Sequence, residues 1–183
     1  RRAVEFNPSL PEAYNQLGLV LWGAGKQDEA LAAWEMVAEV DPYFSFGLAN
    51  AAIHYCVAGE LIRAQEVVDE ALSVLPEDAA LRFAQAYVWQ RTGDNVAAIA
   101  AYRQNIAANP GHFDSYTVLA DLYQSEASFA EADSLYLVVA ARWPDCPKAL
   151  ERVGTHFRER RELERAESFL RRAIQEETHA LYA

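Results

Sequence analysis

The chain has 183 residues, a formal net charge of −11, 52% hydrophobic residues and 23% charged residues. This composition excludes wholesale disorder, and because no apolar run approaches the roughly 18 residues that span a bilayer, we expect no membrane insertion. An acidic protein repels phosphate backbones, so nucleic acid is a poor candidate partner.

A fixed spacing of 34 residues runs through the whole chain. Alanine recurs five times at this spacing, and so does proline, each proline 22 residues before the next alanine. A period of this length is typical of stacked repeats. The alanines are Ala30, Ala64, Ala98, Ala132 and Ala166, and the prolines are Pro8, Pro42, Pro76, Pro110 and Pro144.

With the proline as position 32 of each unit, the chain divides without insertions or deletions. We predict the end of a truncated repeat at 1–10, the start of a further helix at 181–183, and five full units between them. The full units are 11–44, 45–78, 79–112, 113–146 and 147–180.

Each unit is predicted to hold two helices. The first runs for about fourteen residues and ends near a glycine in the first three units, because glycine tolerates the left-handed conformation that terminates a helix. The second begins near Asp28, Leu61 or Asn95 and ends before the proline, where extended backbone is imposed. The glycines are Gly25, Gly59 and Gly93.

Residue size along the repeat predicts how the two helices pack. Position 8 of the first helix is always glycine or alanine, position 20 of the second is alanine, and position 24 is bulky. Small residues on both helices let the backbones approach, and the bulky residue fills the space beside them. Position 8 holds Gly18, Ala52, Ala86, Ala120 and Gly154, and position 24 holds Trp34, Val68, Tyr102, Tyr136 and Leu170.

This pattern resembles the tetratricopeptide repeat over residues 1–180. The resemblance implies an all-α, right-handed superhelical solenoid of helix-turn-helix repeats that binds a protein or peptide segment. The second and third units match more loosely, with Leu48 and Arg82 at the first aromatic position, and the fifth ends in Thr178 instead of proline. The first unit carries the family's residues as Tyr14, Leu17, Gly18, Leu21, Ala30, Trp34 and Pro42, and the fourth as Tyr116, Leu119, Ala120, Tyr123, Ala132, Tyr136 and Pro144.

The ends of the chain show no polar capping helix, which solenoids normally need for solubility. We therefore expect a segment of a larger protein of this family. End-to-end self-association is the alternative.

In this family the first helices line a concave groove, and the resemblance implies which positions face it. Aromatic and aliphatic side chains would bury a peptide, and amide side chains would bond its main chain. Two alternatives stay open: these aromatic residues pack against neighbouring repeats, or another part of the parent protein fills the groove. The predicted groove residues are Asn15, Gln16, Leu19, Trp22, Phe46, Asn50, Ile53, Phe83, Tyr87 and Arg91.

The basic C-terminal unit suggests a second partner, an acidic segment that would meet Lys148, Arg152 and Arg158. An observation against this partner is that the same helices carry acidic residues at ion-pair spacing from basic ones, such as Glu167 with Arg171. This spacing favours solvated ion pairs within the helix instead. Some members of the family bind a C-terminal carboxylate with basic and asparagine side chains from three consecutive units. In this sequence no three consecutive units carry the complete set.

Catalysis, metal binding and cofactors are not expected. His54 and Cys56 point to different faces of one helix, and no phosphate loop or nucleophile elbow is present. Asp114 and Asp121 would lie about 10 Å apart along a helix, too far to share a task. We predict a non-catalytic interaction scaffold. The alternatives are the regulatory or substrate-recruiting arm of an enzyme whose catalytic domain lies outside this chain, and a spacer.

The compartment does not follow from these residues. Cys56 and Cys146 are 90 residues apart and form no disulfide framework. The lack of a disulfide framework fits a mildly reducing compartment and so slightly favours the cytoplasm.

Overall fold

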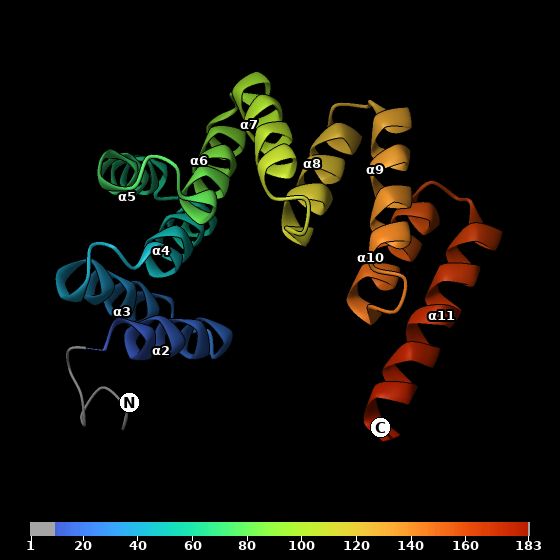
Figure 1. The fold of residues 1–183 in the computed structure, drawn as a ribbon, viewed down its shortest axis with the longest axis horizontal. Helices are drawn as coiled ribbons and strands as arrows, with labels where there is room; N and C mark the ends of the chain where they lie inside the picture. The colour runs from blue at the N-terminus through green and yellow to red at the C-terminus, as the bar shows by residue number, and fades with distance from the viewer. Residues whose placement is uncertain (1–9, 183) are drawn as a thin grey trace. The chain divides into compact units, whose positions relative to one another are not determined.

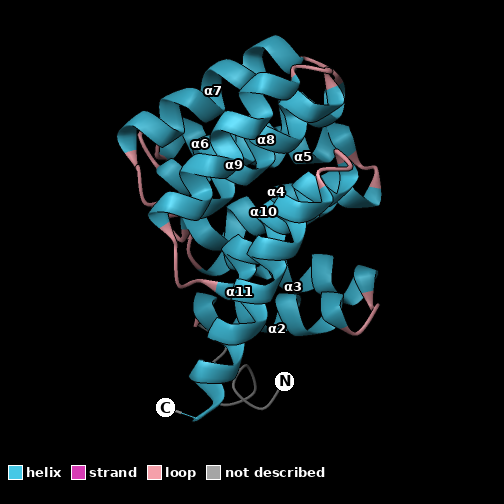
Figure 2. Ribbon diagram, turned by 90° about the vertical axis from the view of Figure 1, so that its right-hand side faces the viewer, coloured by secondary structure: helices cyan, strands magenta, loops and turns pink. Residues whose placement is uncertain are grey.

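The computed structural model describes residues 10–182 and the side chains of residues 10–178. Within this range the chain folds into ten α-helices and no strand (Figures 1 and 2). The truncated repeat expected at 1–10 lies outside the described residues except for Leu10. The helices are α2 (Pro11–Gly23), α3 (Gln27–Val40), α4 (Ser45–Ala58), α5 (Leu61–Val74), α6 (Ala79–Thr92), α7 (Asn95–Ala108), α8 (Phe113–Ser125), α9 (Phe129–Arg142), α10 (Pro147–Glu159) and α11 (Leu163–Tyr182).

The helices fall into two compact units, one ending at Asn109 and the other beginning at Pro110. The first unit holds α2 to α7 and the second holds α8 to α11. Consecutive helices pair as hairpins: α2 with α3, α4 with α5 and α6 with α7 in the first unit, α8 with α9 and α10 with α11 in the second. In the first unit α4 also packs against α2 and α3, and α6 against α4 and α5. Neighbouring hairpins there bury a continuous core between them.

Position 15 of every repeat takes the left-handed conformation that ends the first helix. The predicted glycines do so in the first three repeats, with φ angles of 74°, 86° and 92°. The fourth and fifth repeats place Ala127 (φ 59°) and Arg161 (φ 62°) there instead. The N–H of the next residue then donates to a carbonyl five residues back, as Ser128 does to Tyr123 at 2.8 Å. The turn is therefore retained where its glycine is lost.

The predicted packing of small against bulky residues is confirmed within the hairpins. A Cβ atom on Gly18 would lie 2.5 Å from Cε2 of Trp34, and one on Gly154 would lie 2.6 Å from Cγ of Leu170. The alanines at position 20 are buried. One close contact was not predicted: a Cβ on Gly47 would lie 2.4 Å from Cγ1 of Val37 in the preceding repeat.

The last helix is longer than the others. At Thr178, where the other repeats have proline, α11 continues without a turn. Threonine keeps its backbone N–H and imposes no extended geometry on the residue before it, so the helix has no reason to end there. Residues 181 and 182, expected to start a further helix, lie in α11.

Candidate functional site

The ten predicted groove residues all lie on first helices of the unit that ends at Asn109. Helix α2 carries Asn15, Gln16, Leu19 and Trp22; α4 carries Phe46, Asn50 and Ile53; α6 carries Phe83, Tyr87 and Arg91. Because α4 packs against both α2 and α6, side chains on the three helices adjoin one another. We call these ten residues the first-helix face.

The side-chain amides of two asparagines on this face form a hydrogen bond with each other. Asn15 is buried, and its Oδ1 accepts hydrogen bonds from Trp34 Nε1 at 3.1 Å and from Asn50 Nδ2 at 2.9 Å. Asn15 was predicted to bind a ligand, but both lone pairs of its oxygen are engaged by the protein. It therefore orients Asn50, which is only half-buried and whose amide oxygen is directed by this bond.

A cluster of three aromatic rings connects the first two repeats. The imidazole of His54 stacks on Trp34, with centroids 4.4 Å apart, and contacts Trp22 at a tilt, with centroids 4.3 Å apart. Trp22 and Trp34 also contact each other, at 6.1 Å. Burial lowers the pKa of His54 to about 4, so its ring is neutral at pH 7. Trp22 is thus half-buried against His54 and presents only part of its indole.

Cys56, Tyr87 and Arg91 form a cluster between α4 and α6. Arg91 is exposed and donates from Nη2 to the Cys56 carbonyl oxygen at 3.5 Å. Burial raises the pKa of the Cys56 thiol to about 11, although the Arg91 charge opposes this. Burial also raises the pKa of Tyr87. Cys56 is consequently a protonated, inaccessible thiol and not a nucleophile.

The apolar members of the face differ in accessibility. Phe46 is 66% exposed and Leu19 is 39% exposed, whereas Ile53 and Tyr87 are half-buried. Phe83, predicted to line the groove, is buried beside Tyr102, with ring centroids 5.6 Å apart. Val57 on α4 is 50% exposed and was not among the ten predicted groove residues. It occupies the same repeat position as Arg91, which was predicted, so the repeat pattern could have identified it.

The basic side chains predicted to meet an acidic partner are partly engaged within the second unit. Arg152 forms an ion pair with Asp121, which also accepts a hydrogen bond from Tyr136. Lys148 lies 3.8 Å from Asp114. Asp114 and Asp121, predicted to be separate surface charges, thus each pair with a cation from α10.

A buried histidine that was not among the predicted site residues lies near this network. His156 contacts the oxygen of the Gln124 amide through Nδ1 at 2.7 Å and a carboxylate oxygen of Asp133 through Nε2 at 2.6 Å. Its ring also stacks on Tyr136, with centroids 4.3 Å apart.

Among the described residues, no group of three or more His, Cys, Asp or Glu side chains is placed to hold a metal ion. Within the same part of the chain, none of the helices combines the length and hydropathy that crossing a membrane requires.

Antiparallel helical hairpins that recur every 34 residues define a helical repeat protein. A model of the tetratricopeptide repeat family matches residues 50–113 and 117–179, more than half of the chain. The chain belongs to the tetratricopeptide repeat family.

Solved structures of tetratricopeptide repeat proteins share this fold at low identity. One from Parabacteroides merdae is 17% identical, with a TM-score of 0.77 over 95% of this chain and 68% of that one. The thermophilic protein TTC0263 of Thermus thermophilus is 15% identical, with a TM-score of 0.75 over 91% of each chain. YrrB, described as a repeat protein with an unusual peptide-binding site, is 19% identical, with a TM-score of 0.54 over 100% of this chain and 97% of that one.

Proposed function

We propose that this chain is a non-catalytic interaction scaffold that binds an extended peptide segment along the first-helix face. The observation that carries the proposal is the exposure of Phe46, Val57 and Leu19 on consecutive first helices, beside the half-buried Asn50. Exposed apolar side chains gathered on one face are typical of interaction sites. Membership of a family of interaction modules supports the same function.

The chemistry of the face favours a peptide main chain with apolar side chains. Phe46, Leu19 and Ile53 offer apolar area, and Asn50, held by Asn15, offers an amide oxygen to a peptide N–H. Holding Asn50 before binding lowers the entropic cost of association. Arg91 adds one exposed cation at the α6 end of the face. A peptide with apolar residues and an acidic group fits this arrangement.

Peptides selected from a random phage-displayed library against the full chain provide the test. The double variant Phe46→Ser/Val57→Ser removes exposed apolar area from α4 without touching the core. A matched control, Ile62→Ser/Val96→Ser, changes side chains that are 80% and 82% exposed on the second helices α5 and α7.

The selected peptides are expected to bind the α4 variant at least about tenfold more weakly, since truncation of a hot-spot side chain costs about 2 kcal/mol. They should bind the control unchanged. Equal binding to the wild type and the α4 variant, or loss of binding in the control alone, would place the peptide site elsewhere.

A further inference from the structure

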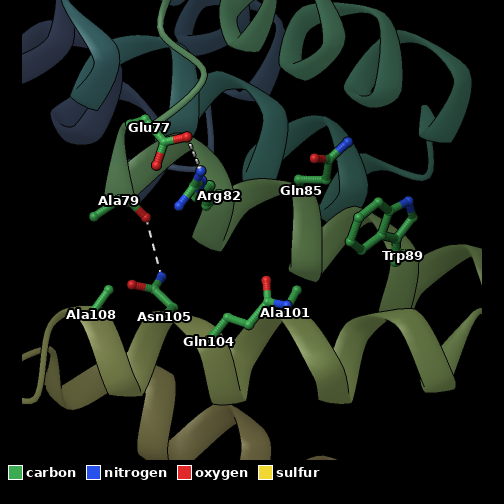
Figure 3. A pocket seen from close by; sticks show the side chains of 9 residues that line it. All are labelled: Glu77, Ala79, Arg82, Gln85, Trp89, Ala101, Gln104, Asn105 and Ala108. Atoms are coloured by element: carbon green, nitrogen blue, oxygen red, sulfur yellow. Dashed lines mark hydrogen bonds and ion pairs between the residues drawn. The ribbon is translucent and has the colours of Figure 1, made fainter.

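Polar side chains replace apolar or aromatic ones in two parts of the repeat array. In the third repeat Arg82, Gln85 and Asn105 stand at positions 4, 7 and 27 and line a pocket of about 200 Å³ between α6 and α7 (Figure 3). Arg82 pairs there with Glu77 at 2.6 Å, and Asn105 donates to the Ala79 carbonyl oxygen at 3.1 Å. These contacts stay within or next to one hairpin. In the second unit, by contrast, polar residues connect two repeats.

His156 is the central residue of that connection. It occupies position 10 of the fifth repeat, where the first, third and fourth repeats have valine or leucine. Its imidazole is 0% exposed and contacts Gln124 on α8 and Asp133 on α9. Asp133 itself stands at position 21, where the first and third repeats have Leu31 and Ile99. A polar pair thus replaces an apolar contact between the fourth and fifth repeats.

Both ring nitrogens of His156 face an oxygen atom. Nδ1 lies 2.7 Å from Oε1 of Gln124, and Nε2 lies 2.6 Å from Oδ1 of Asp133. The orientation of the Gln124 amide is fixed, because its Nε2 donates to a carboxylate oxygen of Glu159 at 2.9 Å. A neutral imidazole has one N–H and one lone pair, so it cannot donate to both oxygens. Only the doubly protonated ring satisfies both contacts.

Carboxylates outnumber guanidinium groups in the network around this ring. Burial disfavours a charged imidazole, but an excess of negative charge and two close acceptors favour it. A proton on the ring supplies the positive charge that the arginines do not. The charged and titratable groups are Asp121 on α8, Asp133 and Tyr136 on α9, Arg152, Glu159 and Arg160 on α10, Glu162 in the turn after α10, and Arg165 on α11.

We propose that His156 is held as an imidazolium at pH 7 and that the protonated ring stabilises the packing of the fifth repeat on the fourth. Loss of the proton at higher pH leaves a lone pair of a fully buried ring facing an acceptor oxygen, which is unfavourable. The attachment of α10 to α8 and α9 therefore weakens as the pH rises. This inference concerns the second unit and does not depend on peptide binding at the first-helix face.

The direction of the effect follows from counting protons. Histidine in an unfolded chain is mostly neutral above about pH 6.5, so at pH 7 and above the folded chain binds one proton more than the unfolded chain. The unfolding equilibrium constant then rises by up to about tenfold per pH unit. Burial raises the pKa of Tyr136, so its hydroxyl stays protonated in this range.

NMR of the full chain with ¹⁵N-labelled histidine tests the protonation state at pH 7. The variant His156→Leu, which copies Leu122 at the same repeat position, identifies the His156 signals by their loss. We expect both ring nitrogens of His156 to have the ¹⁵N shifts of protonated nitrogens. One protonated and one unprotonated nitrogen at pH 7 would overturn the proposal.

Asp133→Asn is the decisive variant for the pH dependence. The asparagine amide donates to the lone pair of a neutral ring, so both nitrogens are satisfied without the second proton. Urea unfolding is measured by circular dichroism at pH 7 and pH 8.5. We expect the unfolding equilibrium constant to rise with pH by up to about tenfold per unit more in the wild type than in this variant.

His112→Asn is the matched control, because it removes another histidine of the second unit and keeps a side chain that caps α8. It should show the pH dependence of the wild type. Equal pH dependence in Asp133→Asn and the wild type, or its loss in His112→Asn, would assign the effect to other groups and contradict the proposal. If Asp133→Asn does not fold, the ring nitrogen shifts of the wild type decide.

Discussion

The imidazole of His54 lies parallel to the indole of Trp34, with ring centroids 4.4 Å apart and an angle of 4° between the planes. His54 occupies position 10 of the second repeat and Trp34 position 24 of the first. His156 and Tyr136 repeat the relationship between the fifth and fourth repeats, at 4.3 Å and 25°. The pair of positions therefore places one aromatic ring on another across a repeat interface.

Folding stability should depend on pH through His54. Burial lowers its pKa from 6.5 to about 4 in the folded chain, and its Nδ1 has no hydrogen-bond partner in the described structure. Above pH 6.5 the ring is neutral in both states. As the pH falls from 6.5 toward 4, the unfolded chain takes up a proton that the folded chain does not, so the free energy of unfolding decreases.

The effect is at most about 3 kcal/mol, because one pKa unit corresponds to about 1.4 kcal/mol and the ring is partly accessible to solvent. Urea unfolding at pH 7 and pH 4.5 measures it in the wild type and in His54→Val, which copies Val20 and Val88. The variant should lose less stability between the two pH values. An identical loss in both proteins would show that other groups titrate.

Glycine should stabilise the turns of the fourth and fifth repeats. A left-handed residue with a Cβ atom costs roughly 1–2 kcal/mol, and the greater freedom of glycine in the unfolded chain offsets up to about 1 kcal/mol. Ala127→Gly and Arg161→Gly should each raise the free energy of unfolding by up to about 1 kcal/mol. Gly93→Ala, the reciprocal change, should lower it. Thermal melting of the three variants decides the matter, and a lower melting temperature for both glycine variants would contradict the prediction.

Gly18→Ala should destabilise the first hairpin although alanine is the better helix former. The new Cβ would meet the Trp34 ring at 2.5 Å, and overpacking of this kind costs about 1–3 kcal/mol. Gly23→Ala, whose Cβ would have no neighbour within 4 Å, is the matched control.

A second substitution tests the cause of that loss. The third and fourth repeats pair alanine at position 8 with tyrosine at position 24, so Trp34→Tyr should restore part of the stability lost in Gly18→Ala. A double-mutant cycle measured by urea unfolding isolates this coupling. Additive effects of the two changes would rule out the contact as the cause.

Leucine at position 20 should be tolerated poorly. Ala64 and Ala98 are both 0% exposed between the helices of their hairpins, so Ala64→Leu or Ala98→Leu should cost about 1–3 kcal/mol. Ala100→Leu, on the exposed face of α7, is the control. Unchanged melting of the buried variants would mean that the hairpins are more loosely packed than the structure shows.

The local repeat structure was readable from the sequence because each signal lies within one hairpin. Gly25, Gly59 and Gly93 are predicted to end first helices and take positive φ angles. The small residue at Gly18 predicts the bulky Trp34, since their separation is set by the geometry of two adjoining helices. Ala127 and Arg161 are the exceptions: neither residue type carries a signal for a left-handed turn, and the turns form there because the rest of each hairpin requires them.

The candidate site was only partly predictable. Phe46 and Arg91 are exposed on first helices, as their repeat positions imply. Asn15 and Phe83 both occupy position 5 of the repeat and are buried, as Ala49 and Thr117 at the same position are. Asn15 bonds to Trp34, and Phe83 lies beside Tyr102. The structure thus shows that position 5, which was expected to face the groove, is buried in the first four repeats.

The sequence by itself determined the period, the hairpins, the helix ends and the family, because these depend on backbone preferences and on residue size at fixed spacing. Only the tertiary structure decided which polar groups are engaged. Asn105 stands where the other repeats have an apolar residue, and only the fold shows that its amide nitrogen is hydrogen-bonded while its buried oxygen has no partner among the described residues. Hydrogen bonding inside a hairpin depends on ångström-scale distances between facing side chains, and those distances exist only once the helices have packed.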